Sequence, residues 1–151
     1  MEDELVLIAP RQSEFDHLSP GQFLESVLLM REQGSGSRRV VEIALEKAGC
    51  KIKSFKKVID LDSTEAIKSA VEAGLGIGFV SCWVISKELE LGTLRVAQLA
   101  GLRIVRHFAL VTRTGPEPHG PAGALRQFAL ARARLLSEVR HKPLPAGGSS
   151  R

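Results

Sequence analysis

Short apolar runs alternate with amphipathic segments along the chain, and this alternation restricts its fold more than any other feature. The apolar runs have the length and bulk of buried strands and occupy residues 5–9, 27–30, 54–61, 77–80 and 104–112. Segments with helical spacing of apolar residues occupy 38–48, 62–74, 83–89 and 124–139. Strands alternating with helices predict βαβ units, a mostly parallel sheet and an α/β fold.

Shorter signals complete the predicted organisation. Ser19 before Pro20 predicts one helical turn. A carboxylate cap at Asp62, with Glu65 three residues later, predicts the start of a helix. We further expect a weak strand at 94–96, a loop at 114–123 and a disordered tail at 141–151. In the last helix we expect an inward face made of Leu125, Phe128, Ala129, Leu135, Leu136 and Val139.

Composition places the chain among ordinary globular proteins. Its 151 residues are 44% apolar and 25% charged, which excludes a chain disordered throughout. No stretch approaches the roughly 20 apolar residues of a membrane span. The acidic start, Met1 to Glu4, is unlike a signal peptide and predicts a cytoplasmic protein. Cys50 and Cys82 are far apart and lack metal or redox spacing, so we expect both to serve as small buried apolar residues.

Charge is distributed unevenly along the chain. Residues 1–92 hold 11 Lys and Arg against 15 Asp and Glu, a net charge of −4, whereas residues 93–151 have a net charge of +8. Four arginines in or next to the last predicted helix could contact nucleic-acid phosphates, namely Arg126, Arg132, Arg134 and Arg140. A solvated helix face is the favoured alternative, because stacking aromatic residues and a recognised binding motif are missing.

The first candidate site is the loop at 32–38, which joins a strand to a helix start. Gly34 and Gly36 allow the backbone to turn with exposed N–H groups, and Ser35 and Ser37 add hydroxyl donors. Together with the positive end of the helix they predict a cradle for an anion or a carboxylate. The loop lacks the Lys and Ser/Thr of a nucleotide P-loop. An ordinary turn, in which the serines only cap the helix, is the alternative.

Two further places lie at predicted strand ends. The residues 62–64 at the next helix start could meet a ligand from a neighbouring strand end, or serve only as a cap. The glycines in 74–78 follow a helix and precede a strand, the reverse of a dinucleotide motif, so we expect a helix stop and close helix–sheet packing. Ser81 leaves that strand and is expected to face the same region as both loops.

Catalytic and metal-binding patterns are missing from the sequence. The four histidines, His17, His107, His119 and His141, have neither metal-ligand spacing nor a partnered nucleophile. We therefore expect a protein that is not an enzyme.

Three segments in order resemble the effector-binding domain of LysR-type bacterial transcriptional regulators. Residues 28–38 are similar to the family's strand followed by an R-E-P-G-S-G-T-R loop. Residues 62–68 and 74–81 resemble its S-T-E-A-I-K…A-G-L-G-I-x-F-x-S pattern, and residues 4–10 resemble a strand that crosses between its two subdomains. The likeness covers residues 4–131 and is closest to regulators of sulfur and carbon assimilation.

The resemblance implies a two-subdomain fold like that of the type 2 periplasmic binding proteins, with a small molecule in the cleft. Together with the anion cradle predicted at 32–38, it predicts a small anionic effector, and we expect no cofactor and no metal. It implies mainly one Rossmann-like regulatory subdomain over 11–105, a crossover strand over 1–10, and a return strand and helix over 106–140. Carried over from the family's second subdomain, the effector contacts are Glu32, Gln33, Ser35, Gly36, Ser37, Asp62, Ser63 and Ser81.

It also implies that the chain lacks two parts of the intact family. These are the N-terminal winged helix-turn-helix that contacts DNA and most of the first subdomain, which supplies half of the ligand site. Intact members form homodimers or tetramers in which a helix equivalent to 38–48 meets a helix of the partner's other subdomain. Two alternatives are a stand-alone type 2 solute-binding protein and a regulator fragment without function.

Overall fold

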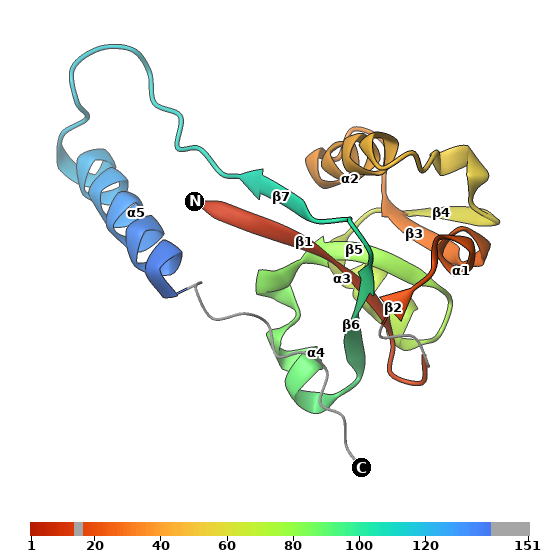
Figure 1. Cartoon of the computed structure of the whole chain (residues 1–151). Coiled ribbons are helices and arrows are strands. Elements are labelled where there is room, and N and C mark those ends of the chain that lie inside the picture. Colours follow the sequence, from red (N-terminus) through yellow and green to blue (C-terminus); the bar gives the residue numbers. More distant parts are fainter. Residues whose placement is uncertain (14–16, 140–151) are drawn as a thin grey trace. The chain divides into compact units, whose positions relative to one another are not determined.

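The computed structural model describes residues 1–13 and 17–139, so the tail predicted at 141–151 lies outside the described part of the chain. Two compact units share these residues (Figure 1). One consists of residues 3–106, and the other of residues 1–2 with the chain from His107 onward.

The described elements follow the predicted alternation. The strands are β1 (Glu2–Pro10), β2 (His17–Leu18), β3 (Val27–Arg31), β4 (Lys57–Leu61), β5 (Ile77–Ser81), β6 (Leu94–Leu99) and β7 (Ile104–His107). The helices are α1 (Pro20–Glu25), α2 (Gly36–Lys47), α3 (Thr64–Glu72), α4 (Ser86–Leu91) and α5 (Gly120–Val139), with 3₁₀ turns η1 (Ile52–Ser54) and η2 (Cys82–Val84).

The sheet is mixed, where a mostly parallel sheet was predicted. Its strand order is β2-β6-β1-β5-β3-β4, and β7 also pairs with β1. Strand β3 runs parallel to β4 and β5, but β1 lies between β5 and β6 and is antiparallel to both. The difference arises because no strand–helix–strand connection joins β1 directly to β5 or β6, and that connection is what makes neighbouring strands parallel.

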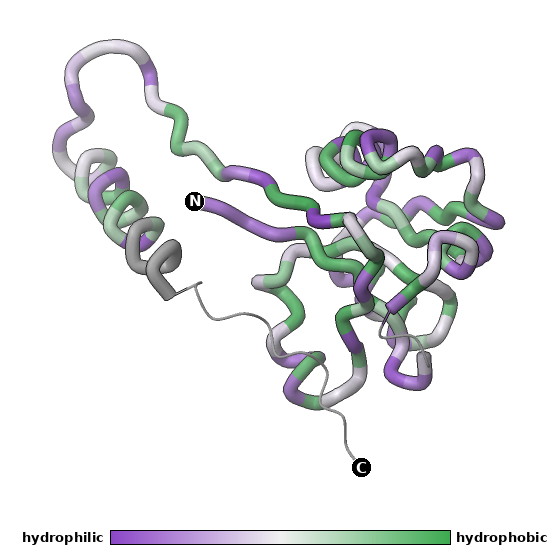
Figure 2. Tube along the Cα trace, viewed as in Figure 1, coloured by the Kyte–Doolittle hydropathy of each residue, from purple (hydrophilic) through white to green (hydrophobic). Residues whose placement is uncertain are grey.

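Two hydrophobic clusters cover the two faces of this sheet. Alternate residues of β1 divide between them: Leu5, Leu7 and Ala9 join one cluster, whereas Val6 and Ile8 join the other. The first cluster includes Phe23 of α1 with Val41 and Leu45 of α2, and the second includes Ile67 and Val71 of α3. Figure 2 shows the same strand changing from hydrophilic at its start to hydrophobic within the sheet.

Local signals explain where several helices begin. Ser19 caps α1 as predicted, because its hydroxyl accepts from the Gln22 amide while the Gln22 side chain bonds back to Ser19. The cap of α3 is one residue later than predicted. Ser63, rather than Asp62, accepts the Ala66 amide at 3.0 Å, because Ser63 is the residue with extended backbone that immediately precedes the helix.

The glycines of 74–78 stop a helix and permit close packing, as predicted. Gly74 follows α3 with φ of +77°, a conformation that favours glycine. A Cβ on Gly76 would meet the Val27 carbonyl oxygen, and a Cβ on Gly78 would lie 2.8 Å from a methyl carbon of Ile67. Helix α3 can therefore approach the sheet only while residue 78 lacks a side chain.

Some expected bounds were wrong. The predicted strand at 54–61 begins only at Lys57, because a 3₁₀ turn occupies Ile52–Ser54. The predicted strand at 104–112 ends at His107, and α5 starts at Gly120, within the predicted loop. Cys50 and Cys82 are half-buried free thiols at the margins of the two clusters, less enclosed than expected.

In the unit that contains α5, the expected inward helix face is exposed where it is described. Leu125 and Phe128 are 68% and 63% exposed, and Ala129 is half-buried. The side chains of Leu135, Leu136 and Val139 lie outside the described part. Within the same unit, Met1 and Phe108 exchange backbone hydrogen bonds of 3.1 and 2.8 Å.

Candidate functional site

Polar segments meet at one edge of the sheet in the unit of residues 3–106. Strands β3, β4 and β5 are parallel, so their carboxyl ends share this edge. Residues 32–35 follow β3, residues 62–63 follow β4, and Ser81 is the last residue of β5. The antiparallel β1 brings its start to the same edge, with Leu5 opposite Ser81. This edge is where open α/β sheets bind ligands.

The loop after β3 leads into an α2 whose first turn has no side-chain cap. Gly34 has φ of +92°, and the Ser35 amide donates to the Glu32 carbonyl at 3.2 Å, which closes the turn. Ser35 stands at the cap position with extended backbone, but its side chain makes no capping bond. The first amides of a twelve-residue helix are thus available to a ligand at the positive end of the helix dipole.

Arg31, the last residue of β3, connects this loop to the start of α3. Its Nε and Nη2 atoms donate to the two carboxylate oxygens of Glu32 at 2.8 and 3.0 Å, and its Nη1 donates to the Thr64 hydroxyl at 3.3 Å. The hydrogen bond from Arg31 lowers the pKa of Glu32 below its usual value. Glu32 is therefore an anion at neutral pH and balances the adjacent guanidinium.

A second cluster joins Ser37 and Ser81 through two residues absent from the predicted site. Arg106 of β7 donates from Nε to Asp3 Oδ2 and from Nη1 to Ser37 Oγ, both at 2.7 Å. The other oxygen of Asp3 accepts from Ser81 Oγ at 2.7 Å. The side chain of Asp3 is fully buried, and that of Arg106 is 20% exposed. Sequence reasoning missed both because Asp3 lies 103 residues from Arg106, and no local spacing marks either.

Arg38 holds the first turn of α2 against two strands. Its Nη1 donates to the Arg31 carbonyl at 2.8 Å and to Asp60 Oδ1 at 2.6 Å, and its Nε donates to Glu42 at 2.7 Å. Burial alone would lower the pKa of Arg38, but the bonds to Glu42 and Asp60 outweigh it and raise that pKa. Arg38, one of the residues that depart from the nucleotide P-loop pattern, is thus a buried cation that stabilises the structure behind the loop.

The remaining residues of the predicted site differ in whether their polar groups already make hydrogen bonds within the protein. Gln33 and Asp62 are exposed. The Ser63 hydroxyl caps α3, and Ser81 accepts from the Trp83 amide at 3.2 Å in addition to its bond with Asp3. Ser63 and Ser81 therefore already have structural partners.

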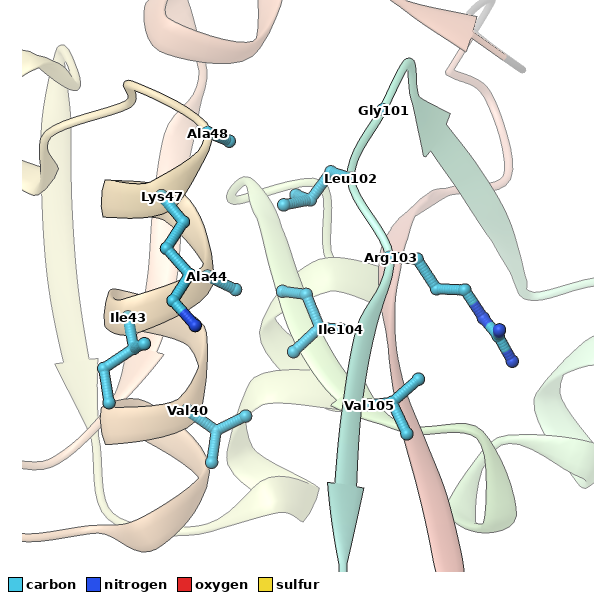
Figure 3. A pocket seen from close by; sticks show the side chains of 10 residues that line it. All are labelled: Val40, Ile43, Ala44, Lys47, Ala48, Gly101, Leu102, Arg103, Ile104 and Val105. Carbon is cyan, nitrogen blue, oxygen red and sulfur yellow. The ribbon is translucent and has the colours of Figure 1, made fainter.

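A separate, mainly apolar pocket of about 380 Å³ lies between α2 and the segment that enters β7 (Figure 3). Leu102 and Ile104 point toward α2, whereas Arg103 points away from it. The helix contributes Val40, Ile43, Ala44, Lys47 and Ala48 to the lining.

Comparison with known proteins decides the family. Residues 1–134 match the family described as LysR substrate binding domain. The chain belongs to this family. It is 39% identical over 116 residues to a probable RuBisCO transcriptional regulator of Guillardia theta, and 34% identical over 143 residues to a RuBisCO operon transcriptional regulator of Allochromatium vinosum. These matches cover 74% and 90% of this chain but 37% and 45% of the relatives, so the chain spans less than half of their length.

A solved structure shows the same fold. The regulatory domain of CcmR from Synechocystis PCC6803, solved in complex with 2-PG, superposes with a TM-score of 0.64 at 22% identity. The match covers 95% of this chain and 66% of the other. The expected type 2 periplasmic-binding-protein-like fold is confirmed. Both relatives named above are transcriptional regulators, in agreement with the prediction that the chain is not an enzyme.

The described residues also bear on the expectations about membrane insertion and nucleic-acid contact. Among the described residues, no helix combines the length and hydrophobicity that a membrane span needs. Of the arginines considered for nucleic-acid contact, Arg126 pairs with Glu117 at 2.9 Å and Arg132 lies 5.8 Å from the centre of the Phe128 ring. The side chain of Arg134 and the whole of Arg140 lie outside the described part.

Proposed function

We propose that the chain senses a small anion or carboxylate and controls transcription, within a LysR-type regulator, through a ligand-dependent conformational change. The observation that carries this proposal is the uncapped first turn of α2 in a loop that also presents the Ser35 hydroxyl. Arg31 places a guanidinium group at the same edge of the sheet. Exposed amides, a helix dipole and a nearby cation all favour a negatively charged ligand.

Within this site we assign the main contact to the loop after β3. The first amides of α2 and the Ser35 hydroxyl are donors that need give up no described hydrogen bond, with Gln33, Gly36 and Ser37 beside them. Ser63 and Ser81 would have to share their hydroxyls with existing partners, and the Glu32 and Asp62 carboxylates would meet hydroxyl or amine groups of the ligand. The effector is therefore expected to carry both an anionic group and a donor group.

The relatives suggest the biological setting. Two of them are named as RuBisCO regulators, and the CcmR regulatory domain was solved with 2-PG. We therefore propose a cytoplasmic regulator of carbon-fixation genes, whose intact form contacts DNA through an N-terminal domain. We also propose a homodimer, or a tetramer built from such dimers, that uses the apolar pocket at α2. Ile43 lines this pocket and is 44% exposed. The substitution Ile43→Glu should therefore weaken association, as measured by light scattering.

Titration calorimetry with 2-PG, inorganic phosphate and succinate tests the sensing role. At least one of these anions should bind, and Ser35→Ala should weaken binding by about tenfold, which corresponds to one hydrogen bond to a charged group. Ser69→Ala on the exposed face of α3 is the matched control and should bind as the unmodified chain does. Absence of binding by all three anions, at concentrations up to the millimolar range, would refute sensing of this ligand class.

A further inference from the structure

Four side chains at the ligand edge form one connected set, which we call the clasp: Asp3, Ser37, Ser81 and Arg106. Asp3 and Arg106 are the first and last residues of their compact unit, so the chain enters and leaves this unit at their ion pair. The pair joins Nε to Oδ2 at 2.7 Å and buries the Asp3 carboxylate completely. The state of this pair therefore affects β1 and β7 at the point where they connect the unit to the rest of the chain.

The clasp also reaches the proposed effector loop. Ser37 is the second residue of α2, and its hydroxyl accepts from the same guanidinium that holds Asp3. Ser81, at the end of β5, donates to the remaining oxygen of Asp3. One arginine is thus shared between the loop and the exit of the unit, while Asp3 keeps a second partner if the arginine moves.

Electrostatics make this sharing sensitive to an anion. The guanidinium of Arg106 lies at the positive end of the α2 dipole, a position that disfavours a cation, and the Asp3 carboxylate compensates. A negative ligand at the first turn of α2 would offer the guanidinium a second counter-charge. It would reduce the need for Asp3 as counter-charge and so shift the balance of the ion pair without itself bonding to Arg106.

We propose that Arg106 is a positioning residue that couples occupancy of the loop at 32–37 to the strands β1 and β7. This role rests on the proposed function, because it needs an anion in the loop. It differs from ligand contact: Arg106 acts through Ser37 and Asp3, and its replacement should affect the transmitted change more than the affinity.

The first test needs no ligand. Hydrogen exchange is followed at the amides of residues 3–5 and 104–106 in the whole chain. Ser37→Ala removes the loop end of the clasp and should accelerate exchange there by about three- to tenfold, the range expected for one hydrogen bond. Ser35→Ala, two residues away and without a side-chain capping bond, should leave these rates unchanged. Equal rates in Ser37→Ala and the unmodified chain would overturn the clasp.

The second test adds inorganic phosphate or 2-PG as the probe. In the unmodified chain the bound probe should change exchange at the same amides. Arg106→Lys keeps the positive charge but loses the fork that spans Ser37 and Asp3, so it should bind the probe within about threefold and no longer transmit the change. Transmission by Arg106→Lys as in the unmodified chain, or loss of its binding altogether, would overturn the positioning role.

The two tests separate this inference from the proposed function. If neither probe binds the unmodified chain, sensing of such anions fails, while the ligand-free result of Ser37→Ala still supports or refutes the clasp. If Arg106→Lys does not fold, as judged by far-ultraviolet circular dichroism, Asp3→Asn replaces it. That variant keeps the hydrogen-bonding oxygen but removes the counter-charge, and it should likewise uncouple binding from exchange.

Discussion

Arg38 shows how one buried cation fixes the geometry of the ligand edge. Its guanidinium spans β3, β4 and α2 through hydrogen bonds to a carbonyl and two carboxylates. Arg38→Lys keeps the charge but loses the planar fork, so we expect the free energy of unfolding to fall by about 1–3 kcal/mol. Urea denaturation measures this loss. Arg39→Lys on the exposed face of α2 is the control, and an equal loss in both variants would contradict the role of the fork.

Glu88 gives the stability a defined pH dependence. The hydrogen bond from Lys68 holds the pKa of Glu88 below its usual value of 4.5. A lowered folded-state pKa adds stability above about pH 4.5, and this stability is lost as the pH falls through the folded-state pKa. Glu88→Gln should cost about 1–2 kcal/mol at pH 7 and flatten the acid limb of urea midpoints measured between pH 3 and 8. Glu90→Gln, on the same helix and exposed, should retain the full acid limb.

Lys68, the partner of Glu88, gives the stability a second pH dependence on the alkaline side. Burial alone would lower the pKa of Lys68, but hydrogen bonds with Glu88 and Glu65 outweigh it and raise that pKa above 10.5. A raised folded-state pKa adds stability below about pH 10.5 that is lost as the pH rises further. The cluster therefore stabilises the fold throughout the neutral range.

Sequence reasoning at the residue scale found side chains marked by local pattern and missed those defined by tertiary contact. Ser35 and Ser37 stand in a loop between a strand and a helix, which is a local signal. Arg106 meets Ser37 across 69 residues, and Asp3 across 103. Their pairing depends on β1 and β7 lying together, and the apolar pattern of each strand does not specify its neighbour.

At the scale of elements, the start of α3 separates capping from ligand contact. Ser63 makes the capping bond that the sequence pattern had placed at Asp62. Ser63→Ala should therefore lower the free energy of unfolding by about 1 kcal/mol, whereas Asp62→Ala should change it by less than about 0.5 kcal/mol. Thermal denaturation of both variants checks this. A larger loss of stability in Asp62→Ala than in Ser63→Ala would instead show that Asp62 caps the helix, as predicted from the sequence.

Most elements were predictable because each has its own periodicity and punctuation. Strand β7 was the exception: its apolar run continues to Val111, yet the strand ends at His107. Val111 is 86% exposed, and a strand persists only where a neighbouring strand accepts its hydrogen bonds. The exposed Leu125 and Phe128 of α5 follow the same logic, since an apolar helix face marks the need for a partner surface without supplying one.

At the scale of the whole molecule, the hydrophobic core and the excess of basic residues lie in different compact units. The ligand edge and both hydrophobic clusters belong to the unit of residues 3–106, and the clusters contain only residues within that range. Seven of the ten basic residues that follow Thr93 lie beyond Val111, namely Arg113, Arg126, Arg132, Arg134, Arg140, Lys142 and Arg151. The net positive charge of +4 therefore describes mainly the segment outside the core.

This division predicts that the core unfolds independently of the C-terminal helix. A chain ended after Arg113 keeps every residue of both hydrophobic clusters, the clasp, and the pairing of Met1 with Phe108. We expect its free energy of unfolding in urea to lie within about 1 kcal/mol of the full chain, with a smaller change in exposed surface and hence a slightly lower m-value.

Ending the chain after Leu99 is the matched control. That cut removes Ile104, which is 3% exposed, and leaves Asp3 without Arg106, so the shortened chain should fail to fold. A large loss of stability in the longer variant would show that α5 stabilises the core, and the two compact units would then have to be treated as one cooperative structure.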